Sequence, residues 1–99
     1  MKINSTKDAG KVTVALEGRL DTITAPDLEK ELKILNEGAE EVIFDFADLE
    51  YISSAGLRVL LSEQKSLQPS GGKMIVKNVN EVIMEVFEIT GFVEVLTII

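Results

Sequence analysis

The chain has 99 residues, with 10 Lys or Arg against 17 Asp or Glu, a formal net charge of −7, and no His, Cys or Trp. Nucleophilic catalysis with a His base, thiol redox chemistry, disulfides and the usual zinc sites all need side chains that this chain lacks. The negative charge argues against a nucleic-acid partner, because such surfaces neutralise phosphates with Lys and Arg. A polar N-terminus and the absence of a run of about 20 apolar residues predict a cytoplasmic chain without membrane insertion.

The first 20 residues predict a β-hairpin. A short strand near Ile3 is followed by a turn at residues 7–10. Apolar and more polar residues then alternate over 12–16, which is the period of a strand with one buried face. We expect this second strand to end at Gly18.

The first helix is predicted to begin at residues 24–27, Thr-Ala-Pro-Asp. Thr can cap a helix, Pro fits its first turn, and Asp suits its positive end. Leu28, Leu32 and Leu35 then recur at helical spacing and form the apolar stripe. Gly38 is expected to end the helix.

The middle of the chain predicts a strand, a second helix and another strand. Residues 42–46, Val-Ile-Phe-Asp-Phe, are nearly all apolar, which favours a central strand covered on both faces. Residues 57–67 carry Leu at helical spacing and stop before Pro69, so a helix is expected there. Residues 74–76 predict the next strand.

The last quarter of the chain predicts a third helix and a final extended segment. Residues 78–81 are expected to cap the helix, Gly91 to end it, and residues 93–98 to be extended. The side chains predicted to point inward are Val82, Val86 and Phe87, and those predicted to point outward are Glu85 and Glu88. The element order β, β, α, β, α, β, α, β predicts one α/β domain over residues 1–99, with a mixed, mostly parallel sheet and three helices packed on it.

Two loops are candidate functional segments, because open parallel sheets place their functional crevice beyond the carboxyl ends of the strands. The first loop covers residues 18–24, before the first helix, and the second covers residues 51–56, before the second helix. In the second loop, Ser53 and Ser54 put two hydroxyls at a helix start. Such a Ser either caps the helix, which is worth about 1 kcal/mol, or accepts a phosphoryl group that free amides and the helix dipole stabilise.

Catalysis and metal binding are disfavoured. A nucleophilic Ser54 needs a positioned base, and without His only Lys or a carboxylate remains. Asp45, Asp48 and Glu50 lie close in sequence, but hard cations need more convergent oxygens than this run guarantees. The sequence therefore predicts no enzyme, no metal and no cofactor.

Three apolar residues flank the candidate loops. Leu20, Ile23 and Ile52 either form a contact patch or plug the ends of the core, and the sequence leaves both interpretations open.

Residues 45–61, DFADLEYISSAGLRVLL, resemble the signature of STAS domains, specifically the bacterial anti-sigma factor antagonists. Residues 18–21 and 24–26 resemble the same family, and the similarity covers essentially the whole chain. The resemblance implies partner switching. The unphosphorylated antagonist binds an anti-sigma factor that is also a serine kinase, the kinase phosphorylates one Ser and the complex dissociates, and a PP2C-type phosphatase reverses the modification.

Carried onto this sequence, the resemblance implies that Ser54 is the phosphate acceptor. Family members commonly have Asp immediately before the acceptor, whereas this chain has Ser53, which is therefore an alternative acceptor. We favour Ser54 because we expect it to lie nearer the helix N-cap and its free amides. Arg58, four residues later, either pairs with the phosphate, contacts the partner, or is simply exposed.

The resemblance also implies a partner-binding face formed by Asp21, Thr22, Ile23, Ser53, Ser54, Ala55, Gly56 and Arg58. An alternative function within the family is an accessory subunit of a transport or stress-signalling assembly, without reversible phosphorylation.

Overall fold

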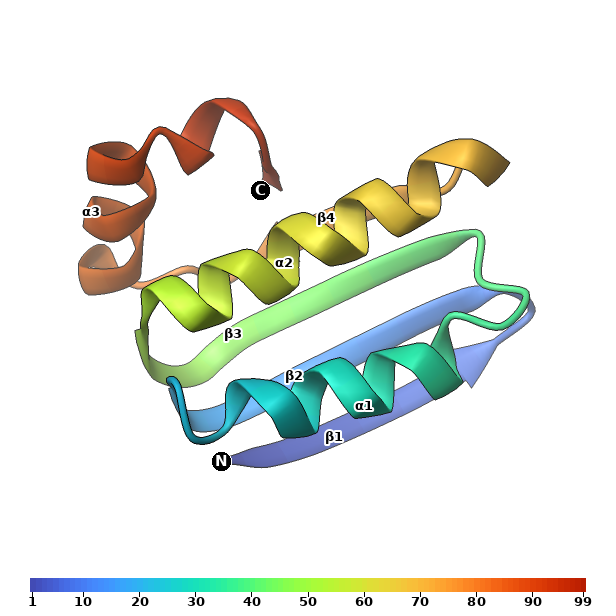
Figure 1. Ribbon diagram of the computed structural model, residues 1–99, viewed down its shortest axis with the longest axis horizontal. Helices are drawn as coiled ribbons and strands as arrows, with labels where there is room; N and C mark the ends of the chain where they lie inside the picture. Colours follow the sequence, from blue (N-terminus) through green and yellow to red (C-terminus); the bar gives the residue numbers. More distant parts are fainter.

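The computed structural model describes residues 1–99 as a five-stranded sheet with three α-helices (Figure 1). In chain order the elements are β1 (Lys2–Asp8), β2 (Lys11–Leu20), α1 (Ala25–Leu35), β3 (Glu41–Ile52), α2 (Ser54–Leu67), the 3-10 turn η1 (Gln68–Ser70), β4 (Lys73–Lys77), α3 (Glu81–Thr90), the 3-10 turn η2 (Phe92–Glu94) and β5 (Thr97–Ile98). The strands lie in the order β1-β2-β3-β4-β5, with β1 antiparallel to β2 and the other pairs parallel. The predicted α/β class, N-terminal hairpin and mostly parallel sheet are confirmed.

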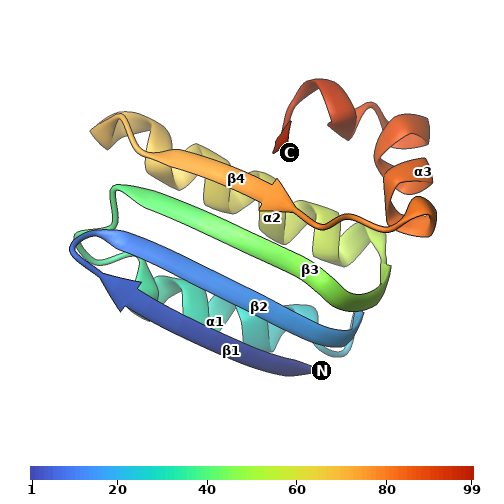
Figure 2. The same cartoon turned by 180° about the vertical axis from the view of Figure 1, so that it is seen from behind.

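Helices α1 and α2 both pack on one face of the sheet, and the opposite face, seen in Figure 2, carries neither of them. Within residues 12–16 of β2 and 42–46 of β3 every second residue is fully buried, and these residues are Val12, Val14, Leu16, Val42, Phe44 and Phe46. The prediction that residues 42–46 are covered on both faces is therefore wrong. Ile43 lies on the open face, where it is half-buried in a row with its strand neighbours Thr13 and Ile75.

Strand β3 continues to Ile52, well beyond the predicted strand. Its pairing with β2 slips twice, which marks two β-bulges. At the first bulge, the Oδ1 atom of Asp45 accepts hydrogen bonds from the Ala47 amide (3.0 Å) and from Asn78 Nδ2 (2.9 Å). The bulges change which residues face the core, so that Leu49 and Ile52 are buried although they break the alternation of residues 42–46.

Helix α3 is rotated relative to its prediction. Val82 is 57% exposed, whereas Ile83 and Phe87 are fully buried, so the inward assignment is correct for Phe87 and wrong for Val82. The cap explains the rotation: Asn80 accepts a hydrogen bond from the Ile83 amide (2.8 Å) and donates one to the Leu49 carbonyl (2.9 Å). Asn80 thereby ties the start of α3 to β3 in one orientation.

The segment after α3 is turned rather than extended. Gly91 has a φ of 81°, and the amides of Val95 and Leu96 both donate to the Phe92 carbonyl, at 3.0 and 2.8 Å. Only Thr97–Ile98 pairs with β4. None of the three helices combines the length and the apolar character needed to cross a bilayer.

Candidate functional site

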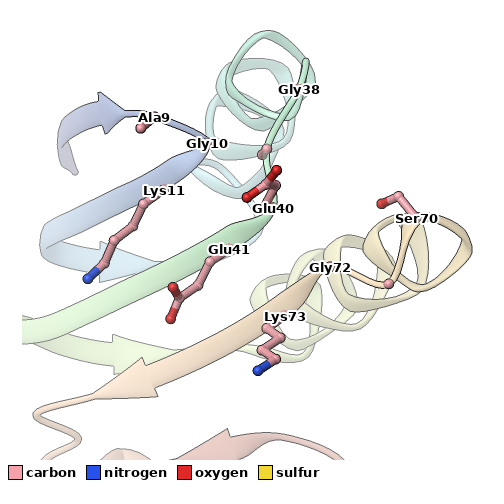
Figure 3. Close-up of a pocket in the computed structure, with 11 residues that line it drawn as sticks. Ala9, Gly10, Lys11, Gly38, Glu40, Glu41, Ser70, Gly72 and Lys73 are labelled. Atoms are coloured by element: carbon pink, nitrogen blue, oxygen red, sulfur yellow. The ribbon is translucent and has the colours of Figure 1, made fainter.

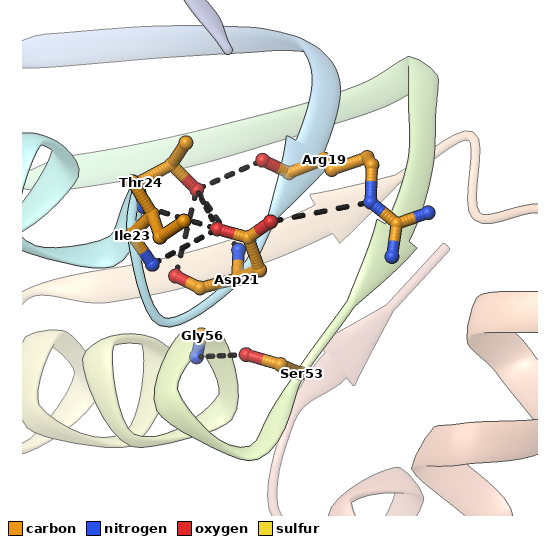
Figure 4. A network of polar contacts seen from close by, with 6 residues as sticks. All are labelled: Arg19, Asp21, Ile23, Thr24, Ser53 and Gly56. Atoms are coloured by element: carbon orange, nitrogen blue, oxygen red, sulfur yellow. Dashed lines mark hydrogen bonds and ion pairs between the residues drawn. The ribbon is translucent and has the colours of Figure 1, made fainter.

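The two predicted loops lie side by side at the carboxyl ends of β2 and β3 (Figure 4). Leu20 is the register partner of Ile52, and the Ser53 amide donates a 2.9 Å hydrogen bond to the Leu20 carbonyl. Beside this contact, Thr22 and Arg58 line one open groove of about 330 Å³ that runs between the start of α1 and α2. The structure therefore brings residues of both loops onto one surface.

The first loop is held by a network around Asp21 and Thr24 (Figure 4). Asp21 Oδ1 accepts from the amides of Ile23 (3.0 Å) and Thr24 (3.1 Å), while the Asp21 amide donates to Thr24 Oγ1 (2.9 Å). Thr24 Oγ1 in turn donates to the Arg19 carbonyl (2.8 Å). Thr24 stands at the N-cap of α1 but makes no side-chain cap bond, contrary to its predicted role. The Asp-x-x-Thr spacing is the sequence signal for this network, because both residue types bond nearby backbone groups.

The network favours the ionised form of Asp21. The hydrogen bond from the Thr24 amide, followed by those from the Ile23 amide and the Thr24 hydroxyl and by the charge of Arg19, lowers the pKa of Asp21 below its usual value, against a smaller opposing effect of burial. The Arg19 Nε atom lies 4.0 Å from Asp21 Oδ2, and its guanidinium lies 4.4 Å above the Tyr51 ring. The carboxylate of Asp21 thus makes its hydrogen bonds to the backbone of its own loop and stabilises the conformation of that loop.

The three apolar residues near the loops divide into two groups. Leu20 and Ile52 are at most 1% exposed and belong to the core. Ile23 is 84% exposed at the tip of the first loop. Leu20 and Ile52 therefore close the ends of the core, which is one of the two interpretations that the sequence leaves open. Only Ile23 is available for contact with a partner.

The start of α2 distinguishes the two serines. Ser53 is the N-cap, with extended backbone (φ −99°, ψ 176°), and its Oγ accepts from the Gly56 amide at 3.4 Å. Ser54 is the first helical residue and is exposed; its hydroxyl makes no hydrogen bond within the chain. The expectation that Ser54 lies nearer the N-cap is wrong, because the bond from the Ser53 amide to Leu20 keeps Ser53 outside the helix. The amides of Ser54 and Ala55, in the first turn, have no backbone partner.

Gly56 lies beneath this surface rather than on it. A Cβ atom at Gly56 would lie 2.7 Å from Leu20 Cγ and 2.8 Å from Ile52 Cγ1. Glycine therefore lets the first turn of α2 approach the ends of β2 and β3. Arg58, by contrast, is exposed and forms no ion pair.

The largest hollow of the molecule lies at the opposite end of the strands (Figure 3). It measures about 610 Å³ and is lined by the turns around Gly10, Gly38 and Gly71. Lys11 and Lys73 border it on either side of Glu41, and Glu40 is the second acidic residue of its lining, so the two positive and two negative charges balance. No group of three acidic side chains that could hold a metal ion is found anywhere in the molecule, and the acidic run from Asp45 to Glu50 forms none.

Residues 2–99 match the family model of the STAS domain. The chain belongs to the STAS family. This STAS protein is 36% identical over 96 residues to BtrV of Bordetella bronchiseptica, which carries the name of an anti-sigma factor antagonist; the match covers 96% of this chain and 83% of BtrV. It is 26% identical over 98 residues to the anti-sigma-B factor antagonist of Bacillus subtilis, covering 99% and 90% of the two chains.

Two solved structures share the fold of this STAS protein. The Bacillus protein SpoIIAA superposes with a TM-score of 0.78 in its unphosphorylated form, at 18% identity over 99% of this chain and 87% of that chain. The phosphorylated form of SpoIIAA superposes with a TM-score of 0.77, at 19% identity over 99% of this chain and 91% of that chain. Family model and relatives together make the chain a STAS protein of the anti-sigma factor antagonist family.

Proposed function

We propose that this STAS protein is an anti-sigma factor antagonist whose partner binding is switched off by phosphorylation of Ser54. The unphosphorylated protein binds an anti-sigma factor with serine kinase activity and so releases a sigma factor, and a PP2C-type phosphatase restores the binding state. The protein acts in the cytoplasm as one domain over residues 1–99, with no catalysis of its own. The observation that carries the proposal is the exposed, unbonded hydroxyl of Ser54 in the first turn of α2.

Several contacts favour Ser54 over Ser53 as the acceptor. The Ser53 hydroxyl is half-buried and accepts from the Gly56 amide, so a phosphoryl group there would compete with the helix cap. A phosphate on Ser54 lies beside the unpaired amides of the first turn and the positive end of the helix dipole. Modification of Ser54 therefore leaves the fold intact, and its effect falls on the binding surface. SpoIIAA, which shares this fold, exists in a phosphorylated form.

The binding surface consists of Thr22, Ile23, Ser54, Ala55 and Arg58. Ile23 supplies an exposed apolar side chain on a loop that Asp21 holds in place. Gly56 contributes by allowing close packing beneath the surface. Ser53 contributes by capping α2 at the edge of the same surface.

The size of the effect follows from local desolvation. Phosphorylation adds about −1.5 to −2 charge at pH 7, which changes the net charge of −7 only modestly. A dianion placed in a packed contact, however, loses its hydration without a matching partner. A loss of about 3 kcal/mol weakens binding roughly a hundredfold.

Phosphorylation by the cognate anti-sigma factor kinase with ATP tests the acceptor directly. Trypsin releases residues 34–58 as one peptide, in which Ser53 and Ser54 are the only Ser or Thr, so fragmentation mass spectrometry can assign the phosphate. We expect phosphate on Ser54, its loss in Ser54→Ala, and its retention in the matched variant Ser53→Ala. Phosphate on Ser53 alone would identify the alternative acceptor. No phosphate on either serine, together with co-purification of transport components, would support the accessory-subunit function instead.

A further inference from the structure

Helix α3 presents an apolar surface that nothing in the chain covers. Val82 is 57% exposed, Ile89 is 78% exposed and Val86 is half-buried between them, and Val93 in η2 is 42% exposed. Positions 82, 86 and 89 follow the i, i+4, i+7 spacing of one helix face. We call these four residues the α3 apolar row.

A row of carboxylates runs beside it. Glu81, Glu85 and Glu88 repeat at the same spacing on the adjoining face, and none of them forms an ion pair. We call these three residues the α3 acidic row. Residues 78–99 contain no Lys or Arg, so no cation of this segment compensates the acidic row. Like charges at i, i+4 destabilise a helix, and a cationic partner would remove this repulsion.

The two rows lie away from the other helices. Figures 1 and 2 show α3 at one end of the sheet, apart from α1 and α2. Ile83 and Phe87 bury the opposite side of α3 in the core. The acidic row borders a shallow hollow of about 340 Å³ to which Val79 and Met84 also contribute. The helix is therefore anchored on one side and offers apolar contact, a depression and negative charge on the other.

We propose that the outer side of α3 is a second docking surface, which binds a basic amphipathic helix of another protein. The apolar side chains of that helix pack on the α3 apolar row, and its Lys or Arg side chains lie over the α3 acidic row, as in other helix-in-groove complexes. A second copy of this chain fits poorly, because it would bring a net charge of −7 and an identical acidic row against this one. An anionic membrane is repelled for the same reason. This surface adds a second partner to the proposed function.

A model peptide tests the proposal on the full chain. The probe is an 18-residue peptide of Leu and Lys with Leu at helical spacing, added to the ¹⁵N-labelled protein at about 0.1 M NaCl. We expect amide chemical shifts to change over residues 81–93 and to stay constant over residues 53–58. A scrambled Leu and Lys peptide of equal charge, without the helical spacing, should bind at least tenfold more weakly.

Paired variants distinguish specific binding at this surface from unspecific attraction between the peptide and the protein. Val82→Ser combined with Ile89→Ser should weaken binding at least tenfold, while Ile34→Ser, at an isoleucine 66% exposed on α1, should change it less than twofold. Glu85→Gln should weaken binding two- to threefold, and Glu37→Gln, at an exposed site after α1, should have no effect. Unchanged affinity in the double variant, equal binding of the scrambled peptide, shifts centred outside α3, or co-sedimentation with phosphatidylglycerol vesicles would each overturn the proposal.

Discussion

Asn36 Nδ2 donates a hydrogen bond of 2.6 Å to Glu63 Oε1 and so joins the end of α1 to the second half of α2. Glu63 is the single ionisable residue of the core, 4% exposed, and its second oxygen has no partner. Burial raises the pKa of Glu63 above its usual value, although the bonds from Asn36 and Ser66 act in the opposite direction. A proton on Glu63 removes the buried charge and turns the unpaired oxygen into a donor.

The stability of the protein should therefore fall as pH rises above about 4.5, the ordinary value for Glu63. The unfolded chain releases this proton first, and the loss continues until the pH passes the raised folded pKa. Glu63→Gln keeps the acceptor for Asn36 and cannot ionise, so we expect it to be more stable than the wild type at pH 7. A gain of 1 kcal/mol raises the melting temperature by roughly 4–8 °C in a domain of this size.

Thermal unfolding at several pH values measures this effect. The two proteins should converge in melting temperature towards pH 4, and Glu37→Gln at an exposed site should follow the wild type throughout. A Glu63→Gln protein that is less stable than the wild type at pH 7 would show that Glu63 is ionised in the folded state.

Gly56→Ala should destabilise the protein. A Cβ atom at 2.7 Å from Leu20 Cγ forces the first turn of α2 away from the sheet. Overpacking of this kind costs about 1–3 kcal/mol, which urea unfolding can detect as a lower midpoint with an unchanged slope. Ser54→Ala, two residues earlier and exposed, is the matched control and should unfold like the wild type. Equal midpoints for Gly56→Ala and the wild type would mean that α2 has room to shift.

Asp21→Ala should loosen the first loop without unfolding the domain. The variant loses the acceptor for the amides of Ile23 and Thr24, so hydrogen exchange at these two amides should become faster. Asp8→Ala, at an exposed position of β1, should leave them unchanged. If exchange at both amides stays at the wild-type rate in Asp21→Ala, the carboxylate does not hold the loop.

The stabilising effect of the Asp21 carboxylate depends on pH in the opposite direction to that of Glu63. The pKa of Asp21 is lowered in the folded state, so its contribution is complete above the ordinary value of 3.8 and is lost as pH falls through the folded pKa. Asp21→Asn should therefore remove part of the acid sensitivity of the loop. Amide exchange of Thr24 measured on both sides of pH 3.8 checks this, and an unchanged pH profile in Asp21→Asn would contradict it.

Much of the fold could be predicted from local patterns, and the errors have local causes. The nearly continuous apolar run of residues 42–46 identifies β3 correctly, but the bulge after Asp45 interrupts the strand pattern, so the sequence does not show that the strand continues to Ile52. The outward rotation of Val82 depends on the bond between Asn80 and Leu49, residues 31 positions apart, which no local pattern reveals. The hydrogen bond between Asn36 and Glu63 joins residues 27 positions apart, and no local sequence pattern predicts it either.

In the candidate site, too, local patterns predict some features, and contacts between residues far apart in sequence determine the others. Its two loops could be placed from strand and helix signals alone, and the structure brings them together as register neighbours. The distinction between Ser53 and Ser54 could not be predicted, because it depends on the bond from the Ser53 amide to the Leu20 carbonyl. That tertiary contact makes Ser53 the cap and leaves Ser54 exposed.

The affinity of the protein for its anti-sigma factor, measured by calorimetry before and after phosphorylation, tests the proposed switch most directly. We predict that Ser54→Ala binds like the unmodified protein, and that phosphorylation of Ser54 or the substitution Ser54→Asp weakens binding, by about a hundredfold for the full phosphate. Equal affinities for the phosphorylated protein, Ser54→Asp and Ser54→Ala would contradict it.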